Sequence, residues 1–501
     1  MKIEDTASGE GKMSLLKNLI VFENGITDEE KKVASEADIT LYTLEEVIFK
    51  GREAANKTFN EPKPDDCFAF SYTSGTTGDP KGVKLSHKMG IMSAAAVNVR
   101  CGKLSMTEED CYISYLPAAH SFEQCIFAMS CITGLKAGFF AGNVLKLTDD
   151  IAVLKPTLFP SVPRLYNRIY GKILEGTKSA SGIKGWLVNK AITTKLANLR
   201  AGNGFTHGLY DKLVFKKMKA ILGGNVKVMI TGSAPISGEV LEFLKICFCA
   251  PITEGYGMTE TMAGSCLTFP DDPQTGVVGG PLQNVKIRLR DIPEMGYLST
   301  DEPPKGEVCF WGPSIMKGYF KNEEKTAEAF HNDWLLSGDV GLVYPNGNIK
   351  IIDRAKNIFK LSQGEYIAPE KLENVYVQSN FVMQAWIYGD SLRDYIVGFF
   401  VMDPDAVKKY KANNGIEGDL SMDDKDFKQA VYDDLNTLAT ANKFNGLEKP
   451  KQICLLSDPF TVESDVLTPT MKLKRNIAKK MLQDKIDAMY ADTNLMAPTK
   501  K

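Results

Sequence analysis

The sequence lacks the features that mark several large classes of protein. Its 501 residues carry a formal net charge of −2, so no overall positive charge attracts nucleic acid or an anionic membrane. The ten cysteines include no C-x-x-C pair and no regular spacing, which predicts reduced thiols in a cytosolic compartment. The longest apolar region, 125–145, is interrupted by Lys136 and several glycines. It falls short of the roughly 20 consecutive apolar residues that a membrane-spanning helix needs.

The ends of the sequence lack targeting signals, and the interior lacks repeats. Residues 1–12 are polar, unlike a signal sequence, and residues 497–501 differ from the peroxisomal Ser-Lys-Leu signal. What is present is a globular composition, with 44% hydrophobic and 24% charged residues. At roughly 150 residues per domain, the length predicts about three domains.

A stretch rich in glycine and hydroxyl groups, S-Y-T-S-G-T-T-G-D-P-K-G-V-K at 71–84, is the most informative part of the sequence. Its glycines let backbone N–H groups turn toward one point, and the hydroxyls and Lys81 beside them suit a polyphosphate. It is not a Walker A loop. That motif has a second glycine five residues after the first, whereas the residue five positions after Gly75 is Pro80. Residues 67–70 predict a buried strand that leads into the loop, where open α/β sheets place ligands. The alternative is a Ser/Thr/Gly surface loop.

Three further motifs follow in the first two thirds of the chain. His120 is one of only four histidines and follows a Leu-Pro turn, although a lone histidine is usually a surface residue. The strand 226–230 runs into T-G-S-A-P, whose small residues let a flat ring approach the backbone. In P-I-T-E-G-Y-G-M-T-E at 251–260, Tyr256 offers an aromatic face to a base, and Glu260 offers oxygen to a hard cation. The locally basic stretch 184–227 predicts a solvated helical face, or a surface for CoA phosphates or anionic lipid.

The last third of the sequence predicts a β-rich body followed by a small α/β unit. Strands are expected at 285–290, 306–311 and 348–353. Asp339, in a Ser-Gly-Asp turn, is suited to accept hydrogen bonds from a ribose diol, although a lone Gly-Asp also occurs in ordinary β-turns. A basic loop at 467–475 precedes an expected helix at 476–489, and its plain alternative is a solvated turn.

Taken in order, these motifs resemble the adenylate-forming (AMP-binding) enzymes, and within them the long-chain acyl-CoA synthetase branch. The resemblance covers roughly residues 60–490. The phrases that carry it, besides T-S-G-T-T-G-D-P-K-G at 73–82, are L-P-A-A-H-S-F-E at 116–123, G-Y-G-M-T-E at 255–260, D-I-P-E-M-G-Y at 291–297, N-I-F-K-L-S-Q-G-E-Y-I-A-P-E at 357–370 and L-T-P-T-M-K-L-K-R at 467–475.

The resemblance implies a multidomain α/β fold with a large sheet domain and a small mobile lid. Residues 67–353 would form the AMP-binding domain, with a β-rich subdomain over about 280–353, and residues 354–501 the lid, hinged near Lys356. Members of the branch carry a domain-scale stretch before the phosphate loop, but only 72 residues precede Thr73 here. Residues 1–66 are therefore expected to be the remnant of a first subdomain.

The family resemblance also implies a two-step reaction. A fatty carboxylate attacks the α-phosphorus of ATP, in the presence of Mg²⁺, to give acyl-AMP and pyrophosphate. The thiol of CoA then attacks the acyl carbon, and AMP leaves. Two anions meet in the first step, so the site needs cationic and N–H partners where charge develops.

Carried over residue by residue, the resemblance assigns a role to each motif. The implied phosphate cradle is Thr73, Ser74, Gly75, Thr76, Thr77, Gly78 and Lys81. The other implied nucleotide contacts are Ser233, Ala234, Pro235, Glu254, Gly255, Tyr256, Gly257 and Thr259 around the base, and Asp339 and Arg354 on the ribose. Thr73 and Glu260 are the expected Mg²⁺ partners, and His120 is expected near the acyl carboxylate and the thiol entry.

The adenylation lysine is expected at Lys472, between carboxylate and α-phosphate. Lys474 competes for this role, because the glycine that usually precedes the lysine is Met471 here. In the second half-reaction, rotation of the lid about Lys356 would replace Lys472 with the loop around Lys360 and Gly364.

The sequence leaves alternatives open. One is a non-catalytic nucleotide- or acyl-binding relative, or a subunit completed by another chain. Another is a ligase for a shorter or aryl acid. The expected partners are fatty acid, ATP and CoA, with no nucleic acid, while peripheral membrane contact and self-association stay open. The expected locations are the cytoplasm and the periphery of the ER, lipid-droplet or peroxisomal membrane.

Overall fold

The computed structural model describes residues 16–22, 25–54, 58, 60–73, 80–143, 146–468 and 471–499. The chain divides into two compact units, Met1–Lys63 and Pro64–Lys501. In the first unit, two parallel strands, β1 (Asn18–Val21) and β2 (Thr40–Thr43), alternate with α2 (Asp28–Glu36) and α3 (Leu44–Glu53). Both helices begin with a capping box, in which a threonine and a glutamate three residues later each accept the other's backbone N–H.

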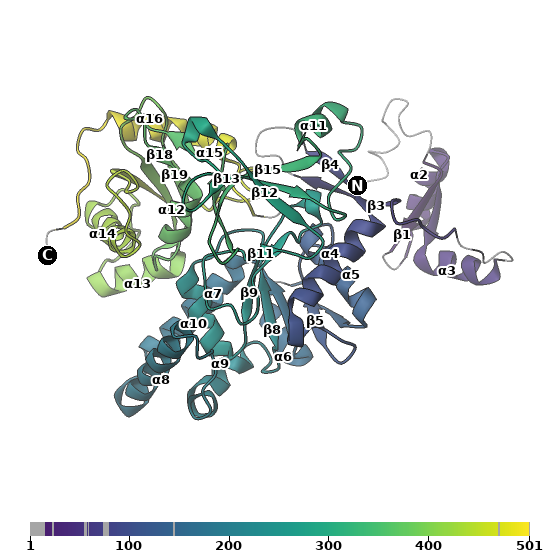
Figure 1. Ribbon diagram of the computed structural model, residues 1–501, viewed down its shortest axis with the longest axis horizontal. Helices are drawn as coiled ribbons and strands as arrows, with labels where there is room; N and C mark the ends of the chain where they lie inside the picture. Colours follow the sequence, from purple (N-terminus) through teal and green to yellow (C-terminus); the bar gives the residue numbers. More distant parts are fainter. Residues whose placement is uncertain are drawn as a thin grey trace. The chain divides into compact units, whose positions relative to one another are not determined.

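A seven-stranded sheet runs through the middle of the second unit (Figure 1), in the order β11-β10-β9-β8-β7-β5-β6. Its parallel strands are β5 (Cys111–Ser114), β6 (Lys136–Phe139), β7 (Leu158–Ser161), β8 (Val228–Thr231) and β9 (Ile252–Tyr256). Two short antiparallel strands, β10 (Cys266–Leu267) and β11 (Gly280–Pro281), extend it.

Helices cover both faces of this sheet, because successive strand residues point to opposite sides. Phe159 and Met229 belong to the core on one face, and their neighbours Leu158 and Val228 to the core on the other. The first face is covered by α6 (Leu147–Leu154), α7 (Pro163–Lys178), α8 (Gly182–Arg200) and α10 (Gly238–Phe248). The second is covered by α4 (His87–Arg100) and α5 (Ser121–Thr133), as Figure 1 shows.

The strand before the glycine-rich loop is present, but it is not buried as the sequence predicts. Strand β3 (Cys67–Thr73) pairs with β4 (Lys81–Ser86) in a two-stranded antiparallel hairpin that is separate from the parallel sheet. Phe68 is 41% exposed and Phe70 is 47% exposed. The prediction fails because an apolar run indicates a strand but not how many layers cover it, and among the described residues no layer covers the face of β3 that carries Phe68 and Phe70.

An antiparallel sheet forms the expected β-rich region. It contains β12 (Lys286–Arg290), β13 (Lys305–Trp311), β14 (Phe330–His331), β15 (Trp334–Val343) and β16 (Ile349–Arg354), close to the predicted ranges. Its apolar side packs on β4 and on the segment around Tyr319, in a core that includes Val83, Leu85 and Phe310. This packing brings the β3–β4 hairpin and the β-rich sheet to the same region.

The last part of the chain forms a small α/β unit around a three-stranded sheet of β19 (Val382–Tyr388), β20 (Val397–Met402) and β21 (Gln452–Leu456). A two-stranded hairpin, β17 (Phe359–Lys360) with β18 (Tyr366–Ile367), precedes it. One face of the sheet packs on α12 (Pro369–Tyr376) and α14 (Lys425–Ala441), with α13 (Pro404–Asn414) beside them. The other face packs on α15 (Arg475–Met481) and α16 (Gln483–Ala491), which replace the single helix expected at 476–489.

Within the described ranges, no helix is both long and apolar enough to cross a bilayer.

Candidate active site

The β3–β4 hairpin places the two described ends of the glycine-rich loop side by side. Thr73 pairs with Lys81 in the hairpin register, and the Thr73 hydroxyl donates to the Lys81 carbonyl at 3.4 Å. The predicted cradle residues Ser74, Gly75, Thr76, Thr77 and Gly78 lie outside the described residues. The hairpin is tied to the turn before α5, because the Ser71 hydroxyl donates to the Ala119 carbonyl at 3.2 Å.

Tyr319 joins two of the predicted residues, Lys81 and Glu260. Its hydroxyl donates a hydrogen bond to Glu260 Oε1 at 2.8 Å, and the Lys81 amine lies 4.6 Å from the centroid of its ring. Both Tyr319 and Glu260 are buried. The tyrosine is held next to β4, because the N–H of Phe320 donates to the Gly82 carbonyl at 2.8 Å. Tyr319 thus contacts both a carboxylate and a lysine, which come from segments about 180 residues apart in the sequence.

Strands β8 and β9 end next to each other and form the site expected for the base. Thr231 pairs with Glu254, and the following turn holds Ser233 in the left-handed region at φ 72°. Ala234 and Pro235 are exposed there. Beyond β9, a Cβ on Gly257 would lie 1.8 Å from the Ala263 carbonyl oxygen, so only glycine fits.

Glu254 is buried at this strand end, and burial raises the pKa of its carboxyl group to about 8, although Lys245 opposes the shift. Among the described residues, its Oε2 atom and the hydroxyl of neighbouring Thr231 have no hydrogen-bond partner. Buried polar atoms without partners are rare in folded proteins. Their presence beside the expected base position fits a ligand with hydrogen-bonding groups.

Asp339 and Arg354, the two residues expected on the ribose, meet in one contact with Tyr256, which was expected at the base. The Tyr256 hydroxyl donates to Asp339 Oδ2 at 2.7 Å, and Arg354 Nε lies 3.5 Å from Asp339 Oδ1. Asp339 and Arg354 also face each other in the β15–β16 register. Burial raises the pKa of the Asp339 carboxyl, and the positive charge of Arg354 opposes that rise.

Lys472, from the C-terminal unit, is close enough for the charges of Asp339 and Arg354 to act on its amine, whereas Lys474 is paired elsewhere. Burial lowers the pKa of the Lys472 amine, as does the nearby Arg354, while the carboxylates of Glu370, Asp339 and Glu260 act in the opposite direction. Lys474 is bound elsewhere, with its amine 2.5 Å from Asp465 Oδ1. Met471, which stands where glycine was expected, adopts the left-handed conformation at φ 64°.

His120 caps the N-terminus of α5, with its Nδ1 accepting the N–H of Phe122 at 3.3 Å. Burial lowers the pKa of its imidazole to about 4, and the positive charge of Lys472 adds to this shift. The histidine is therefore neutral near pH 7. Its position near Lys472 brings the second predicted motif and the last one together.

The residues expected in the second half-reaction lie on the β17–β18 hairpin. Lys360 extends over the ring of Tyr366, 5.2 Å from its centroid, and Gly364 turns the hairpin at φ 95°. Lys356 is exposed just after β16. Thr259 opens the short helix η4 (Thr259–Thr261) that carries Glu260, and Gly255 lies within β9.

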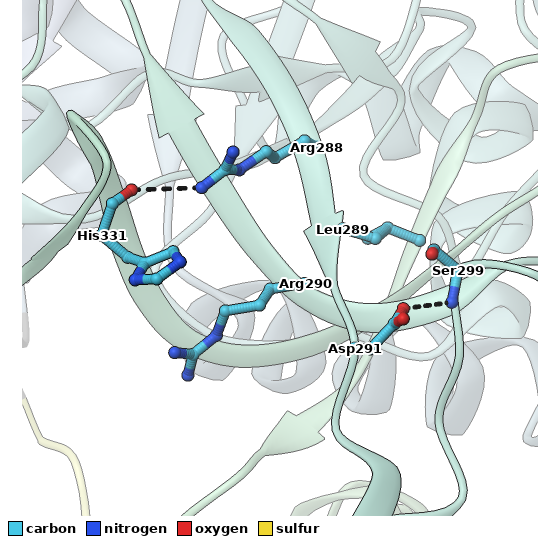
Figure 2. A pocket seen from close by; sticks show the side chains of 6 residues that line it. All are labelled: Arg288, Leu289, Arg290, Asp291, Ser299 and His331. Carbon is cyan, nitrogen blue, oxygen red and sulfur yellow. Dashed lines mark hydrogen bonds between the residues drawn. The ribbon is translucent and has the colours of Figure 1, made fainter.

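A pocket of 220 Å³ lies on the β-rich sheet, and none of its lining residues was predicted as a site residue. Figure 2 shows Arg288 donating to the His331 carbonyl, and Asp291 accepting the N–H of Ser299. Arg290 forms a 2.5 Å ion pair with Glu307. The charged groups that line the pocket already bind protein partners. This pocket is therefore a weaker candidate for the active site than the region around Lys472.

Tyr319 is the site residue that sequence reasoning missed. The sequence offered one signal, a Gly-Tyr pair between two predicted strands, but nothing linked it to Glu260, 59 residues earlier. The link depends on the β-rich sheet packing against β4, which a linear pattern does not reveal.

Residues 9–320 match the model of the AMP-binding enzyme family. Among solved structures, the A domain of a carboxylic acid reductase from Segniliparus rugosus, in complex with AMP and a co-purified carboxylic acid, superimposes with a TM-score of 0.72 at 26% identity. That match covers 95% of this chain and 71% of the other, and it confirms the predicted fold.

Curated relatives give the branch. The peroxisomal long chain acyl-CoA synthetase 6 of Arabidopsis thaliana is 43% identical over 96% of this chain and 69% of its own length. Long-chain-fatty-acid–CoA ligase 5 of Rattus norvegicus is 40% identical over 95% of this chain and 69% of its own length. The chain thus spans about two thirds of the length of these relatives. It belongs to the AMP-binding enzyme family and, within that family, to the long-chain acyl-CoA synthetases.

Proposed function

We propose that the chain activates a long-chain fatty acid with ATP to acyl-AMP and pyrophosphate, and then transfers the acyl group to CoA. The observation that carries this proposal is the convergence of Lys472, His120, Glu260 and the Asp339–Arg354 pair, which come from separate segments. The charge of Lys472 acts on the imidazole of His120, and the charges of the other three act on the amine of Lys472. A site that brings a fatty carboxylate to the triphosphate of ATP requires groups of these kinds.

In the adenylation step, each group has a task that follows from its chemistry. The Lys472 cation lowers the repulsion between carboxylate and phosphate and stabilises the negative charge that develops in the transition state. Asp339 accepts hydrogen bonds from the ribose diol, while Tyr256 and Arg354 hold the Asp339 carboxylate in place. His120 is neutral and therefore adds no charge that would bind the fatty carboxylate too tightly.

The donor set fits Mg²⁺ held together with substrate phosphates. Among the described side chains, no group of three or more His, Cys, Asp or Glu residues is placed to hold a metal ion by itself. Mg²⁺ is commonly bound through one or two carboxylates plus phosphate oxygens, and Glu260 with the Thr73 hydroxyl supplies such oxygens. When bound, Mg²⁺ would neutralise phosphate charge.

We propose residues 354–501 as a lid that turns about Lys356 between the half-reactions, with residues 67–353 as the AMP-binding domain and 1–66 as part of a first subdomain. Lys472 feels the charges of Arg354, Asp339 and Glu260, which are expected near the nucleotide and its metal, while Lys360 rests on Tyr366. This arrangement fits adenylation. Thioester formation would then need the lid turned so that the Lys360–Gly364 hairpin faces the site.

The test is pyrophosphate release from ATP and Mg²⁺ by the 501-residue chain with palmitate, octanoate or benzoate, with and without CoA. We expect release that depends on palmitate, and acyl-CoA only when CoA is added. Release with benzoate or octanoate alone would indicate a ligase for another acid. A folded chain that binds ATP but releases no pyrophosphate with any acid would contradict the proposal and favour a non-catalytic relative.

Matched lysine variants test the assignment of Lys472. We expect Lys472→Ala to abolish adenylation but to form palmitoyl-CoA from supplied palmitoyl-AMP. Lys474→Ala, which removes only the contact with Asp465, should keep both half-reactions. Equal loss of both half-reactions in Lys472→Ala would show that Lys472 has another role.

We also propose peripheral membrane association, because a long-chain fatty acid partitions into membranes. Self-association stays a prediction, which sedimentation velocity at several protein concentrations would measure.

A further inference from the structure

The most basic part of the chain lies on and around α8 and α9 (Lys216–Ala220). Residues 176–238 contain ten lysine or arginine residues and one acidic residue, Asp211. This local excess contrasts with the net charge of −2 for the whole chain. The sequence predicted either a solvated helical face or a surface for CoA phosphates or anionic lipid, so the partners of each charge decide what the region can bind.

Asp211, the acidic residue of this region, is already paired with a lysine of the same region. Lys195 is fully buried, contrary to the expectation of a solvated face, and its amine lies 2.5 Å from Asp211 Oδ1 and donates to the Ile246 carbonyl at 2.6 Å. Arg200 and Lys227 pair with acidic residues of other segments. The exposed lysines of α8, α9 and the π-helical turn η3 (Asp211–Phe215) have no ion pair within the described part of the chain, and they are Lys184, Lys190, Lys212, Lys216 and Lys217.

Large apolar side chains stand exposed between these lysines. Ile183 is 87% exposed and Trp186 is 67% exposed at the start of α8, while Leu209 and Leu213 are 59% and 61% exposed around η3. On α8, Ile183, Trp186 and Lys190 follow a spacing of three and four residues, so they share one helix face. Monomeric soluble proteins rarely gather large apolar groups in one exposed region without a partner.

The two segments are held next to each other by the buried lysine. Lys195 of α8 binds Asp211 of η3 and lies 4.1 Å from the centroid of the Phe215 ring. Figure 1 shows α8 and α9 together below α10, at one end of the central sheet. The exposed lysines and apolar residues of both segments thus belong to one protruding region, here called the basic–apolar surface.

We propose that the basic–apolar surface docks the protein on an anionic lipid bilayer. Exposed lysines complement anionic headgroups, and Trp186, Ile183 and Leu213 suit the boundary between headgroups and acyl chains, where indole rings are enriched. A soluble anion such as CoA would engage the lysines but would leave the apolar residues in water. This proposal rests on the proposed peripheral membrane association and names its surface, and it is tested without ATP, acid or CoA, so its failure is distinct from failure of the proposed reaction.

The test measures binding of the 501-residue chain to vesicles of phosphatidylcholine with 30% phosphatidylserine, and to vesicles of phosphatidylcholine alone. We expect binding to the first only, and weaker binding at high salt because salt screens the lysines. Each lysine near such a surface contributes about five-fold in affinity, so reversing four should lower it by at least about 600-fold. The variant is Lys184→Glu, Lys190→Glu, Lys212→Glu, Lys216→Glu.

A control variant changes net charge by the same amount elsewhere, at exposed lysines outside the surface: Lys103→Glu, Lys425→Glu, Lys480→Glu, Lys485→Glu. It should bind vesicles like the wild type. A second variant, Trp186→Ser with Leu213→Ser, keeps every charge and should lose at least ten-fold in affinity, and it tests the apolar contribution if the charge variant fails to fold. Vesicles carrying brominated acyl chains should quench the fluorescence of wild-type Trp186.

Three results would overturn the proposal. The first is equal binding of the wild type to neutral and anionic vesicles. The second is equal loss of binding in the charge variant and its control. The third is unchanged vesicle binding in the charge variant together with a raised KM for CoA, which would assign the lysines to CoA phosphates.

Discussion

Removing one hydroxyl, by Tyr319→Phe, tests how the site holds Glu260. The Tyr319 hydroxyl donates to Glu260 Oε1 at 2.8 Å, and both side chains are buried. The phenylalanine ring keeps the position that faces the Lys81 amine. The substitution therefore removes a hydrogen bond to the expected magnesium partner while it leaves the lysine contact in place.

The size of the effect follows from the charge of the acceptor. A hydrogen bond to a charged group contributes about 1.5–3 kcal/mol, and loss of a partner that orients a metal ligand commonly costs about 10- to 100-fold in metal affinity or activity. We expect the apparent KM for Mg²⁺ to rise by about 10- to 100-fold. The free energy of unfolding should fall by about 1.5–3 kcal/mol, because the lost hydrogen bond has a charged acceptor.

The assay is the rate of pyrophosphate release at saturating palmitate and fixed ATP while Mg²⁺ is varied, together with urea unfolding. The matched control is Tyr432→Phe, because that hydroxyl donates to the Pro450 and Met496 carbonyls at 3.2 and 3.1 Å in the C-terminal unit. It should lose about 1 kcal/mol of unfolding free energy, because its acceptors are neutral carbonyls, and its KM for Mg²⁺ should be unchanged. If Tyr319→Phe leaves the Mg²⁺ dependence unchanged, or if the control shifts it equally, Tyr319 does not position a metal ligand.

Three further predictions concern other residues of the site. Lys472→Met should raise the pKa of His120 from about 4 toward its usual value, because it removes a positive charge, whereas Lys474→Met should not; NMR of the four histidines measures this. The pKa of Glu254 is raised to about 8, so the unfolding free energy of the wild type should fall as the pH rises from about 4.5 to 8. In Glu254→Gln it should fall less, and urea unfolding across this pH range measures the difference. If the unfolding free energies of the wild type and Glu254→Gln changed equally with pH, the raised pKa of the Glu254 carboxyl would be contradicted. Gly257→Ala should destabilise the chain by about 3 kcal/mol, because its Cβ would lie 1.8 Å from the Ala263 oxygen, whereas Gly176→Ala in α7, with open space around it, should not.

Much of the candidate site could be predicted because its residues sit in local motifs. Tyr256 and Arg354 lie at the ends of β9 and β16, whereas Asp339 lies within β15 and not in the turn that its Ser-Gly-Asp sequence predicted. Tyr319 escaped prediction because its contact with Glu260 depends on packing between distant segments. The burial of Lys195 and the exposure of Phe68 escaped for the same reason. The charge and hydropathy of the sequence do not show which helix or sheet covers a residue in the fold.

The segment around the proposed hinge is bound on both sides, which limits how the lid can move. Asp353, the residue before Arg354, accepts the N–H of Glu370 at 2.9 Å and so holds the first turn of α12. Arg475 binds Glu373 of α12 through two hydrogen bonds of 2.8 and 2.6 Å, which links the Lys472 loop to the same helix. Rotation about Lys356 would leave Asp353 behind and carry Glu370 away, so this contact would have to break. Because α12 and the Lys472 loop are joined through Arg475, Lys472 would leave the nucleotide in the same motion. The contact between Asp353 and Glu370 would therefore favour the adenylation arrangement, and its loss would accompany the change to thioester formation.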